Sequence, residues 1–154
     1  MDIRIEQKDG FKAAGISMDA TPKSDFGRLW DDLFEKYSDP QLSALGSGLS
    51  LGVCYDMKED GGFRYMAGCD VHNAQKARGM GLEVLEVPAA EYAVVPLKGP
   101  VPQCILDGWR YVWDTFLPQR GYRHAGTPDF EVYAQGDLNS PGYEMELWVP
   151  VKKG

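Results

Sequence analysis

The chain has 154 residues and a formal net charge of −7, and its 4 Trp, 8 Tyr and 6 Phe side chains are numerous enough for both a core and a ring-lined cavity. This length fits one domain that can bury a substantial core. Duplex nucleic acid is bound mainly by Lys and Arg against phosphates, and the sequence has no basic run or basic helix face, so the composition argues against direct nucleic-acid binding.

The same composition excludes several other classes. Three cysteines, Cys54, Cys69 and Cys104, lie among apolar neighbours without paired spacing, so we expect buried reduced thiols. No apolar run approaches the roughly 20 residues of a membrane span, and the first residues lack the order of a signal peptide. We therefore expect a soluble cytoplasmic chain without membrane contact. Metal-ligand, phosphate-loop and nucleophile motifs are not found, so no metal, cofactor or catalytic residue is predicted.

The first half of the chain predicts strand, helix and hairpin in that order. After an extended segment from Ile3 to Gly15, the sequence Thr21-Pro22-Lys23-Ser24 signals a helix start. Apolar residues then recur at spacings of three and four from Phe26 to Tyr37, which predicts an amphipathic helix. A Gly/Ser-rich connection leads to a predicted hairpin with strands Leu49 to Asp56 and Phe63 to Val71.

The second half predicts the same order of elements. Its helix opens at Val101-Pro102, and Pro118 and Gly121 are expected to end it. The predicted strands are Leu82 to Val87, Tyr92 to Leu97, Phe130 to Tyr133 and Tyr143 to Val151.

The two halves can be aligned with each other. Trp30 falls on Trp109, Phe34 on Trp113, and Phe63 to Ala67 on Tyr143 to Leu147. We therefore predict a single α+β domain over residues 1–154, built as a tandem pseudo-symmetric repeat of strand–helix–strand–strand (SHS2-type). It would have antiparallel sheets and two main helices around a central cleft, where ligands commonly bind. Repeat one would cover about 1–72, a linker about 73–81, and repeat two about 82–154.

Glu146 is the main candidate for a binding residue. Strand alternation puts Tyr143, Met145 and Leu147 on one face, and Glu146 and Trp148 on the other. One interpretation makes Glu146 a solvated surface acid. The other makes it the countercharge of an organic cation, because an indole face attracts positive charge and a carboxylate neutralises it.

Aromatic side chains offer further candidates. Core packing is one interpretation of the helical rings, but Trp and Tyr carry polar atoms that need partners, so some rings can line a cavity. The candidate ligand-binding aromatic residues are Trp30, Tyr55, Tyr65, Tyr92, Trp109, Trp113, Tyr133 and Trp148.

Three segments carry a resemblance to a known family. Phe63 to Val71 is similar to an "aromatic–x–Tyr–x–x–Gly–x–x–Val" strand, Pro128 to Tyr133 to a strand of the second half, and Glu144 to Val151 to a closing "Glu–apolar–aromatic–apolar–Pro–apolar" strand. In this order they resemble the gyrase-inhibitor-like (GyrI-like) small-molecule-binding domain, also called the AraC-type effector-binding domain. The resemblance covers nearly the whole chain.

The resemblance implies a ligand and a set of site residues. Family members that are fused to DNA-binding domains sense lipophilic cations, including multidrug ligands. The family's pocket acid falls on Glu146 and its helical tryptophan on Trp109. Gly68 matches a family glycine at a close backbone approach. No helix-turn-helix segment is expected, so the chain looks like a solitary member, such as the integron-cassette drug-binding proteins, acting in sensing, sequestration, transcription regulation or drug resistance.

Two alternatives to simple ligand binding stay open. One is an inhibitor that binds a protein partner such as DNA gyrase or a regulator, for which an acidic surface is suited to mask a basic one. The other is a hydrolase of reactive electrophilic natural products in which Glu146 acts as a general base.

Overall fold

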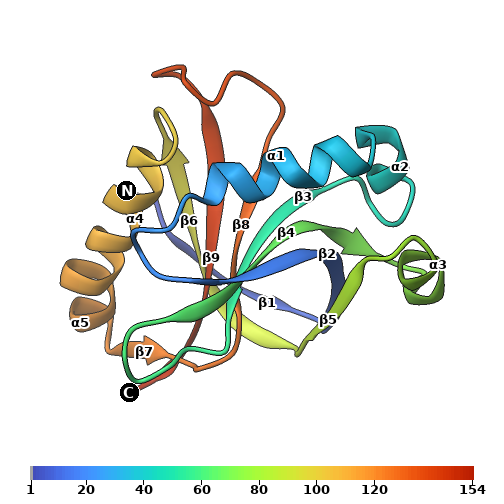
Figure 1. Ribbon diagram of the computed structural model, residues 1–154. Coiled ribbons are helices and arrows are strands. Elements are labelled where there is room, and N and C mark those ends of the chain that lie inside the picture. The colour runs from blue at the N-terminus through green and yellow to red at the C-terminus, as the bar shows by residue number, and fades with distance from the viewer. Residues whose placement is uncertain (1) are drawn as a thin grey trace. The chain divides into compact units, whose positions relative to one another are not determined.

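The computed structural model describes residues 2–154, and the chain divides into two compact units (Figure 1). Unit 2 is Gly10–Pro88, and unit 1 combines the chain up to Asp9 with Ala89–Gly154. Each unit is an antiparallel sheet with helices packed on it, which confirms the predicted α+β class with its tandem organisation.

Unit 2 contains the first helix and the first hairpin. Its strands lie in the order β3-β4-β2-β5, and all neighbouring pairs are antiparallel. Its elements are β2 (Phe11–Ala20), α1 (Phe26–Lys36), α2 (Asp39–Ser43), β3 (Ser50–Tyr55), β4 (Phe63–Val71), α3 (Ala74–Gly79) and β5 (Glu83–Val87).

Helix α1 begins where Asp25 caps it, because the Asp25 carboxylate accepts a hydrogen bond from the backbone N–H of Arg28 at 3.2 Å. Leu29 and Leu33 on its inner face are buried against Tyr65 and other residues of β4. Full burial of one such leucine contributes about 1.5–3 kcal/mol, so this apolar face holds the helix on the sheet.

Unit 1 has the corresponding arrangement with strands in the order β1-β6-β9-β8, and with β7 paired to β9. Cys104, Val112 and Phe116 from its helical segment pack on one face of this sheet. Its elements are β1 (Arg4–Lys8), β6 (Ala90–Lys98), α4 (Gln103–Tyr111), the π-helix η1 (Val112–Phe116), α5 (Leu117–Arg120), β7 (Tyr122–His124), β8 (Asp129–Tyr133) and β9 (Glu144–Lys153).

The edge strand of each unit lies outside the repeat to which the sequence assigned it. Strand β1 comes from the first half of the sequence but pairs with β6, whereas β5 comes from the predicted second repeat but pairs with β2. Lys8 pairs with Ala90 within unit 1, and Phe11 pairs with Val87 within unit 2. Each unit thus takes its edge strand from the other half of the sequence, an exchange that a count of elements in chain order does not reveal.

Two local predictions also differ from the structure. The predicted linker contains α3, which Asn73 caps by accepting from the N–H of Lys76. Pro118 does not end the second helix, because η1 bonds the N–H of Leu117 to the carbonyl of Val112 and leaves Pro118 in the first turn of α5. The helix ends at Gly121, whose φ of 70° is left-handed.

Gly68 occupies a close approach between β4 and β2, as the resemblance implies. A Cβ atom on Gly68 would lie 1.9 Å from the carbonyl oxygen of Ala14, and one on Gly15 would lie 2.0 Å from the carbonyl oxygen of Ala67. These contacts are with backbone atoms that the β2–β4 ladder fixes, so neither position has room for a side chain.

We predict that Gly68→Ala lowers the free energy of unfolding by about 1–3 kcal/mol or more, because the added methyl forces the two strands apart. Gly79→Ala is the matched control, since nothing lies within 4 Å of a Cβ placed there. Chemical unfolding followed by circular dichroism measures both variants. Equal stabilities of the two would contradict the steric role of Gly68.

Candidate functional site

Strand β9 of unit 1 has one buried face and one face that carries Glu146. Met145, Leu147 and Val149 point into the core beneath the unit's helices. By strand alternation Glu146 and Trp148 point to the opposite side, and both are half-buried. We call this side of the unit 1 sheet the Glu146 face.

The Glu146 face contains a compact aromatic cluster. Phe130 of β8 and Val94 of β6 are the register partners of Trp148 on its two sides. The Phe130 ring stacks on the Trp148 ring at 5.5 Å between centroids, and the Tyr92 ring meets each of them edge-on, at 5.3 Å from Phe130 and 5.6 Å from Trp148. Because Tyr92 and Phe130 are buried, they hold the half-exposed Trp148 ring in a fixed orientation.

Both oxygens of the Glu146 carboxylate accept hydrogen bonds. One oxygen accepts a hydrogen bond from the indole N–H of Trp148 at 3.1 Å, and the other accepts from the Arg4 guanidinium of β1 at 3.2 Å. The Glu146 side chain is 36% exposed, which leaves it accessible from solvent. The first bond fixes the acid beside the ring, and the second places a cation there.

The Trp148 ring already interacts with cations of the chain itself. The Arg4 guanidinium carbon lies 5.9 Å from the ring centroid, and the Lys8 ammonium lies 5.7 Å from it. Both distances are within the range of a cation–π contact. The face thus combines a carboxylate, an oriented indole and two positively charged side chains.

Tyr92 carries a polar group that the surrounding structure does not satisfy. Its side chain is 0% exposed, and its hydroxyl has no hydrogen-bond partner among the described residues. Burial, with a further contribution from the Asp129 carboxylate, raises the pKa of Tyr92 to about 12.

Trp30, Tyr65 and Tyr133 pack on the helix sides of their own sheets. In unit 2 the Trp30 indole donates to the hydroxyl of Tyr65 at 3.0 Å, and both rings pack on the helix side of the sheet. Tyr133 packs against the helix-side core of unit 1 and donates to Glu131 at 2.8 Å. These contacts satisfy the polar atoms of the three rings within the packed core.

Trp109 and Trp113 lie on the helical segment of unit 1. Their rings stack on each other at 6.2 Å, and Trp113 also stacks on His124 at 6.0 Å. Trp109 is half-buried against the core, whereas Trp113 is 52% exposed. Since α4 covers the other side of the sheet, these two rings do not belong to the Glu146 face.

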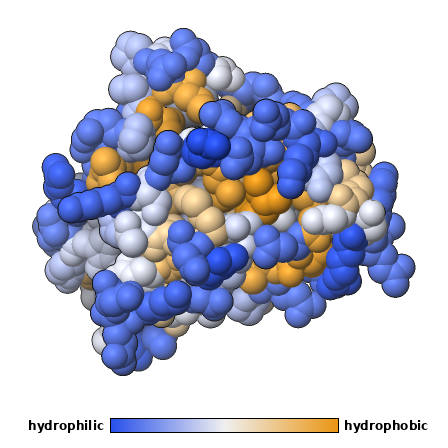
Figure 2. Space-filling model, viewed as in Figure 1, coloured by the Kyte–Doolittle hydropathy of each residue, from blue (hydrophilic) through white to orange (hydrophobic). Residues whose placement is uncertain are grey.

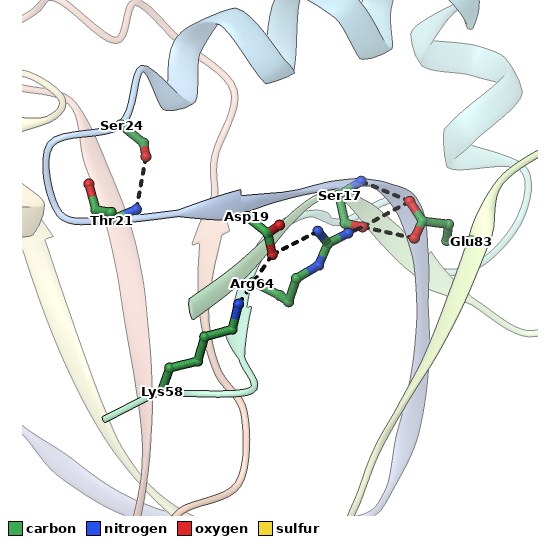
Figure 3. A network of polar contacts seen from close by, with 7 residues as sticks. All are labelled: Ser17, Asp19, Thr21, Ser24, Lys58, Arg64 and Glu83. Carbon is green, nitrogen blue, oxygen red and sulfur yellow. Dashed lines mark hydrogen bonds and ion pairs between the residues drawn. The ribbon is translucent and has the colours of Figure 1, made fainter. Parts of the chain in front are cut away.

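Tyr55 lies on the side of the unit 2 sheet away from its helices, and a network of polar side chains lies on the same side. It is the register partner of Arg64, which bonds Ser17 and Asp19, while Ser17 donates to Glu83 at 2.8 Å (Figure 3). The hydrogen bond from Arg64 lowers the pKa of Asp19. Acids and bases are thus paired with each other on this side.

Sequence reasoning missed Arg4, Lys8 and Phe130. Phe130 could have been found, because it precedes Val132 by two residues in a predicted strand and so shares its face. Arg4 gave no such signal, since it is 142 residues from Glu146 and reaches it only through the pairing of β1 with β6.

Apolar side chains are also exposed elsewhere in the part of the chain that the structure describes. Figure 2 shows apolar side chains reaching the surface between hydrophilic ones, and the exposed large residues include Phe34, Leu106 and Trp113. A shallow hollow of about 320 Å³ on α4 and η1 is lined by Asp107, Arg110, Tyr111, Asp114 and Thr115, none of which was a predicted ligand residue. Among the described residues, no helix is long and apolar enough to cross a membrane.

Comparison with known proteins identifies the class. The chain is similar to the structure of SAV2435 bound to tetraphenylphosphonium, with a TM-score of 0.82 and 22% identity over 99% of this chain and 94% of the other. It is also similar to an integron cassette protein from the mobile metagenome of Vibrio cholerae, with a TM-score of 0.73 and 22% identity over 97% and 95% of the two chains. The fold is that of a GyrI-like effector-binding domain.

The family follows from the sequence itself. Residues 4–151 match the family described as integron-associated effector binding protein, Cass2, and the chain belongs to it. The chain is also 28% identical to the transcriptional regulator BrlR of Pseudomonas aeruginosa over 98% of its own length, and it spans 56% of that relative. The family confirms the predicted role as a domain that binds a small-molecule effector; the gyrase-inhibitor and hydrolase alternatives stay predictions.

We predict that Tyr92→Phe leaves the free energy of unfolding unchanged or raises it, because the variant removes a buried hydroxyl without a partner. Tyr143→Phe is the contrasting control: its hydroxyl donates to the carbonyl of Ala134 at 2.7 Å and accepts from the Ala134 N–H at 3.0 Å. That variant should lose about 1–3 kcal/mol in denaturant unfolding. A larger loss in Tyr92→Phe than in Tyr143→Phe would contradict the assignment.

The raised pKa of Tyr92 also predicts a pH dependence. In the unfolded chain Tyr92 loses its proton near pH 10, whereas in the folded protein it keeps the proton up to about pH 12. The unfolded state therefore binds fewer protons in this window, and stability falls as pH rises from 10 to 12. Denaturant midpoints across that range should fall less steeply for Tyr92→Phe than for the wild type; equal slopes would contradict the shift.

Proposed function

We propose that this domain binds lipophilic organic cations on the Glu146 face, with Glu146 as the countercharge and Trp148 as the ring on which the cation lies. The observation that carries the proposal is the hydrogen bond of 3.1 Å from the Trp148 indole to the Glu146 carboxylate. It orients an acid and an aromatic face toward the same position, where cations of the chain already lie.

The electrostatics of this position favour a cation over a neutral ligand. A half-exposed carboxylate beside a half-buried indole attracts positive charge through both the acid and the ring quadrupole. The cation–π contribution is about 0.5–2 kcal/mol, depending on how far the ligand is desolvated. The buried Tyr92 and Phe130 rings beneath Trp148 provide a rigid base, which reduces the ordering cost of binding.

The similarity to SAV2435 supports this choice of ligand class. That protein is bound to tetraphenylphosphonium, a delocalised lipophilic cation, and has the same fold. In this chain we infer that binding serves to sense or sequester such cations, in transcription regulation or drug resistance. A domain that spans 56% of a transcriptional regulator fits a sensing role in which a separate element acts on the signal.

We predict that Glu146→Gln weakens tetraphenylphosphonium binding by about 1–3 kcal/mol, because it removes the charge while keeping an oxygen that accepts from the Trp148 indole. Isothermal titration calorimetry measures the affinity. Glu144→Gln is the matched control, since it removes the same charge from an exposed position two residues away on the same strand. Unchanged affinity in Glu146→Gln, or equal losses in both variants, would contradict a specific role for Glu146.

A second variant tests the ring. Trp148→Phe keeps an aromatic side chain but removes the indole N–H and has the weaker quadrupole of phenyl, so we expect about 0.5–2 kcal/mol of lost affinity for the same cation. Trp113→Phe serves as the control because Trp113 lies on the helical segment. The proposal predicts no loss in that control, and a loss confined to it would place the ligand elsewhere.

A further inference from the structure

Arg4 lies between two carboxylates on the Glu146 face. One guanidinium nitrogen is 3.2 Å from Glu146, and another is 3.6 Å from Glu6. Glu6 is two residues along β1 and therefore projects from the same side of the strand. The guanidinium therefore bridges the two carboxylates, and release from Glu146 would leave it paired with Glu6.

The same guanidinium occupies the position proposed for the ligand. Its contact with Glu146 uses the carboxylate that a bound cation needs, and its carbon is 5.9 Å from the centroid of the Trp148 ring. Two positive charges at that position repel each other, so a ligand cation and Arg4 compete for Glu146.

The contact is also weak enough to be displaced. The Arg4 side chain is 51% exposed and that of Glu146 is 36% exposed, so solvent screens the ion pair. Exposed pairs of this kind favour the paired arrangement by no more than about fivefold. Arg4 would therefore reduce the affinity of the site without closing it.

We propose that Arg4 is an internal competitor that sets the affinity of the cation site, and that a bound cation transfers it from Glu146 to Glu6. This inference rests on the proposed function. Apparent affinity falls by the fraction of molecules in which Arg4 occupies the site, and Glu6 limits this fall by offering Arg4 a second carboxylate. The pairing of β1 with β6 places this competitor beside the site.

The first test compares Arg4→Gln with the wild type in calorimetric titrations with tetraphenylphosphonium. We expect Arg4→Gln to bind about two- to fivefold more tightly, because the competitor is gone. Arg28→Gln is the matched control for net charge, since Arg28 is an exposed arginine on α1 that pairs with Asp32. A gain in Arg4→Gln that is no larger than the gain in Arg28→Gln would overturn the proposal.

The second test uses Glu6 in a double-mutant cycle. In the wild-type background, Glu6→Gln should weaken cation binding, because the displaced Arg4 loses its second partner. In the Arg4→Gln background the same change should have a smaller effect, and the difference between the two measures the exchange. Equal effects of Glu6→Gln in both backgrounds would show a general charge effect and would overturn the transfer of Arg4.

These outcomes separate the inference from the proposed function. If Glu146→Gln loses affinity while Arg4→Gln gains none, the cation site stands and the competitor role fails. If tetraphenylphosphonium binds to neither the wild type nor Arg4→Gln, the proposed function fails and the inference fails with it. Circular dichroism confirms that each variant is folded before its affinity is compared.

Discussion

The pairing of β1 with β6 is the constraint on which the candidate site depends. Strand β1 is contributed by the start of the chain, yet its hydrogen bonds are with a strand more than eighty residues later. This pairing brings Arg4 and Lys8 to the side of the unit 1 sheet that carries Trp148 and Glu146. Without it, the acid and the ring would keep their mutual hydrogen bond but lose the charges that surround them.

Strand periodicity was sufficient to predict that Glu146 and Trp148 share a face of the sheet. Glu146 and Trp148 share a face because side chains alternate along β9, and the structure places them in direct hydrogen-bond contact. The order of elements and the duplication also predicted the α+β class. Both depend on local patterns, which a single sequence contains.

The repeat boundaries and the position of Arg4 depended on pairing between strands that are far apart in the sequence. The edge-strand exchange moved the repeat boundaries, and Arg4 reached Glu146 only through it. For Tyr65, however, the sequence already indicated a core position. The internal alignment makes Tyr65 equivalent to Met145, which alternation puts on the face opposite to Glu146, and both residues lie in the packed cores of their units.

The glycine at the β2–β4 contact has a consequence for binding stoichiometry. In the internal alignment Gly68 corresponds to Trp148, and a side chain at Gly68 would collide with the backbone of β2. Duplication therefore could not give unit 2 an indole at the equivalent position, however the surrounding residues diverged. A close backbone contact in one copy therefore confines the aromatic cluster to the other, and under the proposed function a pseudo-symmetric chain would bind one cation by this route rather than two.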